Sequence, residues 1–269
     1  MDIDSPKDAA RTAERSQTFQ ILARTGYVVL GIIHVIIGVI AISVATGNGG
    51  GEAEESGALE QVAKTPFGSV LLWAIAIGLF ALAIWSVAEA LLARGKDTKE
   101  KWGERLKEGG KAVVYIAVGA TAVVFALGGS SDSSESSQGL AATLIQAPGG
   151  VFVLALIGLI VFGIGAGFVW RGVRVSFTES LNVPSGAVGS ALVALGVAGY
   201  VAKGIGVAIV GVLFIVAAFT LDPEQAGGLD AALKSLLELP FGVVLLVGVG
   251  LGIIAYGAYS VARAKYARL

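Results

Sequence analysis

Residues 66–92 read PFGSVLLWAIAIGLFALAIWSVAEALL, and Glu89 is the only charged residue among them. A run this long and apolar exceeds the roughly 20 residues that a helix needs to cross the hydrocarbon core of a bilayer. The run begins with Pro66, followed two residues later by Gly68. Pro is well placed in the first turn of a helix, because the N–H that it lacks would have no partner there. We therefore expect a membrane-spanning helix that starts at this Pro.

The same start occurs three times along the chain. Pro66-Phe67-Gly68 returns as Pro148-Gly149-Gly150 and as Pro240-Phe241-Gly242, each time at the head of an apolar run. A second apolar run precedes each motif, and each pair of runs forms one repeat. The sequence therefore predicts an all-α membrane protein with six transmembrane helices, at about 25–45, 67–92, 111–128, 150–172, 200–219 and 241–262.

These six helices form three tandem hairpin repeats. After an N-terminal segment, 1–21, the repeats cover 22–94, 103–174 and 195–266. Each hairpin crosses the membrane twice, so all three have the same orientation. We expect them to pack around a pseudo-threefold axis along the membrane normal, as parallel repeats do.

Composition supports a membrane protein and excludes several kinds of site. The chain is 55% hydrophobic and 14% charged, with a mean hydropathy of +0.81, whereas soluble domains carry about 25% charge. It has no Cys, which excludes disulfides, zinc–thiolate sites and iron–sulfur clusters. A single His and a single Met exclude bis-His or His/Met haem ligation within one chain. We expect no catalytic, cofactor-binding or metal-binding residues, and no enzyme activity.

The positive charges predict the orientation in the membrane. Sixteen Lys and Arg residues lie before the first helix or in the segments that follow the second, fourth and sixth, and only two lie in the other loops. By the positive-inside rule, both termini are cytoplasmic and residues 46–65, 129–147 and 220–239 are external. The expected location is the plasma membrane. The net charge of −1 gives no reason to expect nucleic acid as a partner.

The repeat motif resembles that of a known family. The residues that carry the resemblance are Gly57-Ala58-Leu59, Pro66-Phe67-Gly68, Ile77-Gly78-Leu79 and Trp85, together with the copy that contains Leu236, Pro240-Phe241-Gly242 and Leu251-Gly252. This pattern is similar to the bacterial domain of unknown function 1206 family of triple-repeat membrane proteins. Repeat 2 departs from it, with Gly149 in place of Phe and Gly167 at the position of Trp85. The resemblance implies an integral membrane protein and brings no activity.

Four polar residues fall within or beside the predicted spans. His34 lies inside the first helix, where it could be a proton-linked group or a neutral imidazole bonded to a backbone carbonyl or to a nearby Ser or Tyr. Lys203 shares a repeat position with Lys111, so we expect it near the cytoplasmic face, where it could snorkel. Glu89 stands where the other repeats carry Arg. We expect it to pair with Lys111 or Lys203, either as a structural ion pair or as part of a proton path.

Two further expectations concern packing and the basic loop. Two GxxxG pairs, Gly163/Gly167 and Gly248/Gly252, are typical of close helix contacts. The segment 94–111 mixes basic and acidic residues around Trp102, which fits either a short helix lying on anionic lipid or a solvated loop.

The sequence leaves two functions open. The leading interpretation is a non-enzymatic structural or partner-binding membrane component, because no catalytic constellation is present. The alternative is a small-ion or small-solute conduit along the pseudo-threefold seam, supported by His34, Glu89 and Lys203. Expected partners are the lipid bilayer and either another membrane protein or a second copy of the chain.

Overall fold

The computed structural model describes residues 17–48, 51–92 and 98–267, and this part of the chain is all-helical without a β-strand. Six of its helices are long and apolar enough to cross a membrane. They are α2 (Gln17–Ala45), α4 (Gly68–Leu92), α5 (Thr98–Ala126), α7 (Gly150–Val173), α8 (Ala187–Thr220) and α10 (Gly242–Tyr266). The prediction of an all-α protein with six candidate spans is therefore confirmed. The predicted cytoplasmic segment 1–21 lies mostly outside the described residues.

A short helix precedes each of the three Pro motifs. These helices are α3 (Glu55–Ala63), α6 (Ser133–Gln146) and α9 (Leu229–Ser235), the last flanked by the 3₁₀ turns η2 (Pro223–Gln225) and η3 (Leu236–Glu238). Each repeat thus consists of a long helix, a short helix, a Pro and a second long helix. Another 3₁₀ turn, η1 (Ser176–Ser180), follows α7.

The backbone explains the motif that follows each Pro. The residue after Pro has a positive φ in all three repeats: 67° at Phe67, 75° at Gly149 and 62° at Phe241. This left-handed conformation suits Gly better than Phe, so the departure of repeat 2 from the motif keeps the geometry. The next residue is Gly in every repeat because a Cβ there would collide with a backbone carbonyl of the short helix, such as that of Val62 against Gly68.

Two helices extend further than the sequence predicts. α5 begins at Thr98 rather than near residue 111, and α8 begins at Ala187 rather than near residue 200. The polar start of α5 is helical and continuous with the span, which corrects both expectations for residues 98–111, the described part of segment 94–111. Ion pairs three residues apart, such as Lys107 with Glu104, stabilise such a polar helix. α8 continues because nothing in its apolar start interrupts a helix.

The chain folds as two compact units. Unit 1 takes its described residues from 1–30, 59–130 and 260–269, and unit 2 from 31–58 and 131–259. A core of unit 1 contains Tyr27, Leu82 and Trp85. A core of unit 2 contains Leu154 and Phe214 among small residues. The arrangement of the three hairpins about an axis stays a prediction.

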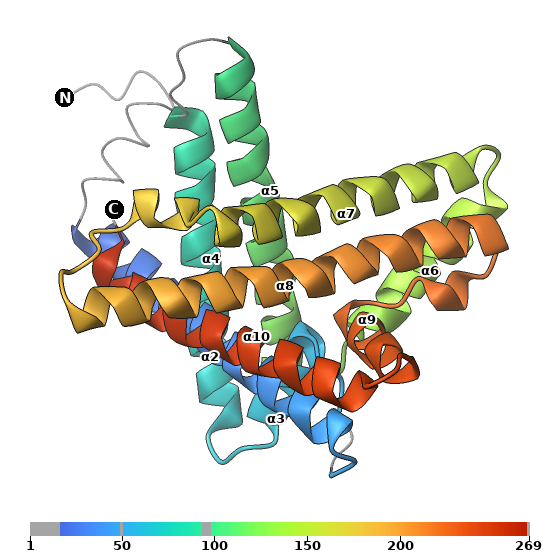
Figure 1. The fold of residues 1–269 in the computed structure, drawn as a ribbon, viewed down its shortest axis with the longest axis horizontal. Coiled ribbons are helices and arrows are strands. Elements are labelled where there is room, and N and C mark those ends of the chain that lie inside the picture. Colours follow the sequence, from blue (N-terminus) through green and yellow to red (C-terminus); the bar gives the residue numbers. More distant parts are fainter. Residues whose placement is uncertain (1–16, 49–50, 93–97, 268–269) are drawn as a thin grey trace. The chain divides into compact units, whose positions relative to one another are not determined.

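Glycine contacts join the first long helix of one repeat to the second long helix of another. In unit 2, α7 and α8 run side by side (Figure 1), and a Cβ on Gly158 would lie 2.8 Å from the Gly211 oxygen. Also in unit 2, a Cβ on Gly38 of α2 would lie 2.6 Å from the Gly250 oxygen of α10. In unit 1, a Cβ on Gly119 of α5 would lie 3.1 Å from the Phe80 ring of α4. The pairing is cyclic: repeat 2 packs on repeat 1, repeat 3 on repeat 2, and repeat 1 on repeat 3.

The predicted GxxxG pairs are only partly used. A Cβ on Gly163, Gly167 or Gly248 would meet nothing within 4 Å, whereas one on Gly252 would collide with Ala202. The glycines of α7 that contact α8 are Gly158, Gly165 and Gly172, seven residues apart. The expectation that Gly163 and Gly167 pack closely is therefore wrong, because they lie on the other side of the helix.

Candidate functional site

Two of the predicted polar residues meet inside unit 2. The Nζ atom of Lys203, on α8, lies 2.8 Å from Nε2 of His34, on α2. His34 is only 4% exposed and packs against the ring of Tyr256, with centroids 4.8 Å apart. Lys203 therefore turns toward His34 and does not snorkel to the membrane surface. The contact between Lys203 and His34 was not predicted, because the two residues occupy different repeat positions.

Aromatic rings surround this pair. The Lys203 ammonium lies 4.6 Å from the ring centroid of Tyr256 and 5.7 Å from that of Phe168. Tyr256 in turn meets Tyr200 edge to face at 5.4 Å. Aromatic faces attract a cation without supplying a negative charge. The rings of Tyr256 and Phe168 thus attract the positive charge of Lys203.

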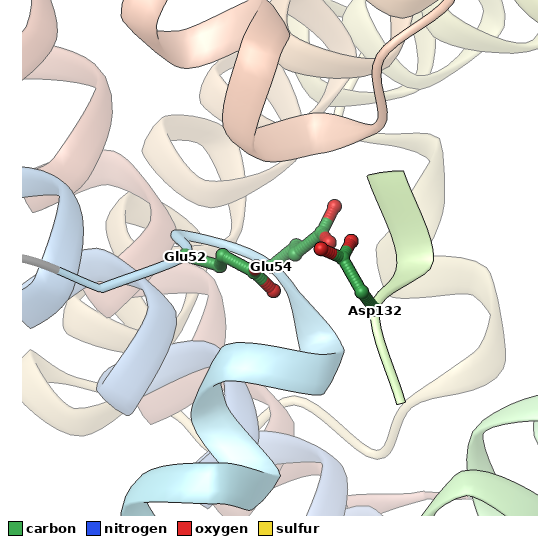
Figure 2. Close-up of side chains that lie close together, drawn as sticks. All are labelled: Glu52, Glu54 and Asp132. Carbon is green, nitrogen blue, oxygen red and sulfur yellow. The ribbon is translucent and has the colours of Figure 1, made fainter. Parts of the chain in front are cut away.

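A second polar cluster lies where the short helices begin. Oxygen atoms of Glu52, Glu54 and Asp132 lie within 4.8 Å of one another (Figure 2), and Glu54 is 1% exposed. Hydroxyl groups accompany the carboxylates, since Ser56 Oγ donates to Glu54 Oε1 at 3.0 Å. We call this cluster the polar node and define it as Glu52, Glu54, Ser56, Asp132, Ser134 and Asp230.

Hydrogen bonds at the node link the loops of all three repeats in a circle. The Ala53 N–H of repeat 1 donates to Asp230 Oδ1 of repeat 3 at 2.8 Å. The Gly228 N–H of repeat 3 donates to Ser134 Oγ of repeat 2 at 3.3 Å. The Ser134 N–H of repeat 2 donates to Glu54 Oε1 of repeat 1 at 3.1 Å. These bonds give backbone N–H groups near the starts of α3, α6 and α9 a side-chain acceptor, where helices have N–H groups without partners.

Burial raises the pKa of two carboxyl groups in the node. Burial and, secondly, the charge of Asp132 raise the pKa of Glu52 from its ordinary value to about 7. Burial also raises the pKa of Glu54, although the bond from Ser56 opposes the effect. Asp230 forms an ion pair with Lys234, whose Nζ lies 2.6 Å from its Oδ2. Glu52 can therefore gain or lose a proton near neutral pH.

The node also offers the kind of oxygen ligands that hard cations use. Among the described residues, Glu52, Glu54 and Asp132 form a group whose oxygens could hold a metal ion such as Ca²⁺ or Mg²⁺. This group was not expected from the sequence, where its acids were assigned only to external loops. The one signal was Asp132 directly before Ser133-Ser134-Glu135, a pattern typical of a helix N-cap.

The helix that carries Asp230 of the node, α9, packs on α8, the helix that carries Lys203. A Cβ on Gly206, three residues after Lys203 on α8, would lie 2.9 Å from Leu229 Cδ1, at the start of α9. The negative charge of Glu55, next to Glu54, acts directly on Lys203. The node and the pair thus belong to the same compact unit.

The other predicted residues meet in unit 1. Lys111 Nζ lies 2.5 Å from Glu108 Oε1, one turn earlier on α5. Glu89, near the end of α4, interacts with the carboxyl group of Glu108 and with the indole of Trp85, and feels the charge of Lys111. Glu108 was not singled out from the sequence, because it appears there as one of several charges in a basic segment.

Comparisons with known proteins agree with the repeat analysis. The family described as Domain of Unknown Function (DUF1206) matches residues 25–93, 108–175 and 198–267. The chain is 31% identical over 255 residues to the uncharacterized protein YxxB of Bacillus subtilis (strain 168), which covers 90% of this chain and 89% of that protein. No solved structure matches.

Proposed function

We propose that this chain, which belongs to the DUF1206 family, is a proton-linked conduit for a small ion or solute. The observation that carries the proposal is the contact between Lys203 and His34 inside the candidate membrane spans. Ionisable residues inside the membrane are costly and usually mark ion or proton pathways. The structural or partner-binding role, which the sequence favoured, is the alternative outcome of the test.

The repeats themselves argue that the pair is not needed for folding. The position of Lys203 is Leu30 in repeat 1, and the position of His34 is Val207 in repeat 3. The same kind of helix therefore forms with apolar residues at these places. Replacing buried charged or polar pairs with apolar residues is often neutral or stabilising. A pair retained at such a cost fits a role in transport.

The pair can hold one proton but not two. Two positive charges 2.8 Å apart repel by roughly 6 kcal/mol at an effective dielectric constant of about 20. A second proton reaching either group would therefore displace the first. This property suits a site that passes protons on.

The polar node supplies a route to the pair. Glu52 and Asp132 are partly exposed, while Glu54 is buried, and Glu55 acts on Lys203. The pKa of Glu52, near 7, suits exchange of protons with water at neutral pH. Because this end of the bundle carries the acidic loops, we place it outside the cell, with both termini cytoplasmic and the protein in the plasma membrane.

The test measures proton flux in liposomes that contain the purified protein and a pH-sensitive dye. We expect the parent to carry protons, and Lys203→Leu and His34→Val to abolish the flux while leaving a folded protein. These substitutions copy residues of the other repeats. Lys64→Leu is the matched control, because Lys64 pairs with Glu60 at the surface, and it should keep the flux.

Two results would contradict the proposal. Unchanged flux in the Lys203→Leu/His34→Val double variant would remove the pair from the pathway. A folded parent with no flux of protons or coupled ions would leave a non-enzymatic structural component, whose partner or second copy is then sought by co-purification from native membranes.

A further inference from the structure

The same contact between helices occurs three times. In two cases it joins an Arg to a Tyr, and in the third it joins two Glu residues. Tyr27, Glu108 and Tyr200 are equivalent residues of the three first helices, and Arg263, Glu89 and Arg171 are the residues that they meet. The Arg263 guanidinium carbon lies 4.5 Å from the Tyr27 ring centroid, and that of Arg171 lies 5.7 Å from the Tyr200 centroid. In the remaining contact, Glu108 meets Glu89. Two contacts therefore hold a fixed cation, and the third holds two acids.

In the acidic contact, one buried carboxyl oxygen lacks a hydrogen-bond donor among the described residues. Glu108 is 2% exposed, and its Oε1 faces Lys111 at 2.5 Å and Lys107 at 3.5 Å. Its other oxygen, Oε2, is buried and accepts no hydrogen bond from any donor in the described part of the chain. A buried acceptor without a donor is destabilising. Glu89 meets this carboxyl group, and it can donate a hydrogen bond to Oε2 only when it carries a proton.

We propose that Glu89 and Glu108 form a proton-binding site, in which one exchangeable proton takes the place that a guanidinium occupies in the other two contacts. Two carboxyl groups in contact do not both stay ionised, because their charges repel. The proton lies on Glu89 and is donated to Glu108 Oε2. This site belongs to unit 1 and does not depend on the pair in unit 2.

The neighbouring charges are compatible with one proton. Lys107 and Lys111 face Glu108 from α5, and the charge of Arg263, from α10, acts on Lys111. Trp85 of α4 contacts Glu89 from within the same helix. The lysines stabilise Glu108 as the carboxylate, which leaves Glu89 to carry the proton. Lys107 and its partner Glu104, one turn earlier on α5, are each more than 40% exposed.

Infrared spectroscopy tests the proposal directly, because a protonated carboxyl group absorbs at a different frequency from a carboxylate. We expect the spectrum of the parent at neutral pH, minus that of Glu89→Gln, to show the carbonyl band of one protonated acid. Glu104→Gln is the control on the same helix and should show no such difference. Subtraction removes the contribution of the polar node, which every variant shares.

Stability supplies the second readout. Glu89→Gln keeps a donor for Glu108 Oε2 and should melt within a few degrees of the parent, whereas Glu89→Ala leaves the acceptor without one and should melt several degrees lower. Glu89→Arg/Glu108→Tyr copies the other two contacts and should fold and lose the band. The proposal is overturned if the band persists in Glu89→Gln, or if Glu89→Gln and Glu89→Ala are equally destabilised.

Discussion

Substituting Gly158 of α7 with Ala should separate two helices by a predictable amount. The new Cβ would lie 2.8 Å from the Gly211 oxygen and 2.9 Å from the Ile215 nitrogen, both backbone atoms of α8. Ordinary contact needs about 3.5 Å, so the helices must move apart by roughly 0.6 Å at this point. A gap of that size forfeits about a quarter to a half of the dispersion energy of the atoms beside it.

We expect a net loss of about 1–2 kcal/mol. Overpacking costs about 1–3 kcal/mol, and replacing Gly by Ala inside a helix returns up to about 1 kcal/mol. The melting temperature in detergent should then fall by roughly 2–8 °C, which tryptophan fluorescence can follow. Gly163→Ala and Gly167→Ala are matched controls on the same helix, because nothing lies within 4 Å of either new Cβ. These controls should melt at or above the parent.

A Gly158→Ala protein that melts as high as the Gly163→Ala protein would refute this reasoning. It would mean that α7 and α8 are not held together by close backbone contact at Gly158 and Gly211.

Three more predictions concern orientation, pH and the Pro motif. In this Cys-free chain, a Cys at Ser136 should react with a membrane-impermeant thiol reagent in intact cells, whereas a Cys at Thr98 should not; the reverse pattern would invert the topology. Because the pKa of Glu52 is raised in the folded protein, its contribution to stability is fully present below about pH 4.5 and lost as the pH rises through about 7. The melting temperature should therefore fall over that window, and a Glu52→Gln protein that shows the same fall would exclude Glu52 as the cause. Phe67→Gly should keep or raise the melting temperature, because Phe67 has a φ of 67°, whereas Phe67→Val should lower it, since a branched residue resists that conformation; equal melting of the two would contradict the explanation.

The features that the sequence predicts well are those carried by runs of residues. Six candidate spans, three starts at Pro and the family all follow from apolar length and repetition, because crossing a bilayer requires both. The expected starts of α5 and α8 are too late in the sequence, because Lys111 and Lys203 were interpreted as lying at the membrane boundary. A lysine ends a membrane helix only if its ammonium must reach water, and these two find Glu108 and His34 instead.

The candidate site was less predictable because its contacts cross between repeats at unequal positions. Repeat alignment places His34 beside Tyr115 and Val207, so it gives no hint of Lys203 as a partner. The acids of the polar node are spread over separate loops, and the short helices that bring Glu54 and Asp132 together lack a strong sequence pattern. The GxxxG spacing also does not show which side of a helix its glycines face. Gly163 and Gly167 have this spacing, yet a Cβ on either would meet nothing within 4 Å.

The cyclic pairing of the long helices has a consequence for the order in which the protein can be made. α2 leaves the ribosome long before α10, yet its Gly38 packs on Gly250 of that later helix. At about 5–20 residues per second, the 211 residues between these positions take roughly ten to forty seconds to synthesise. Until then the glycine face of α2 is open to lipid or to other proteins of the insertion machinery. Repeat 1 is therefore synthesised before the other two but gains its contact with α10 only when repeat 3 is made. A chain truncated before α10 would lack the partner of the glycine face of α2.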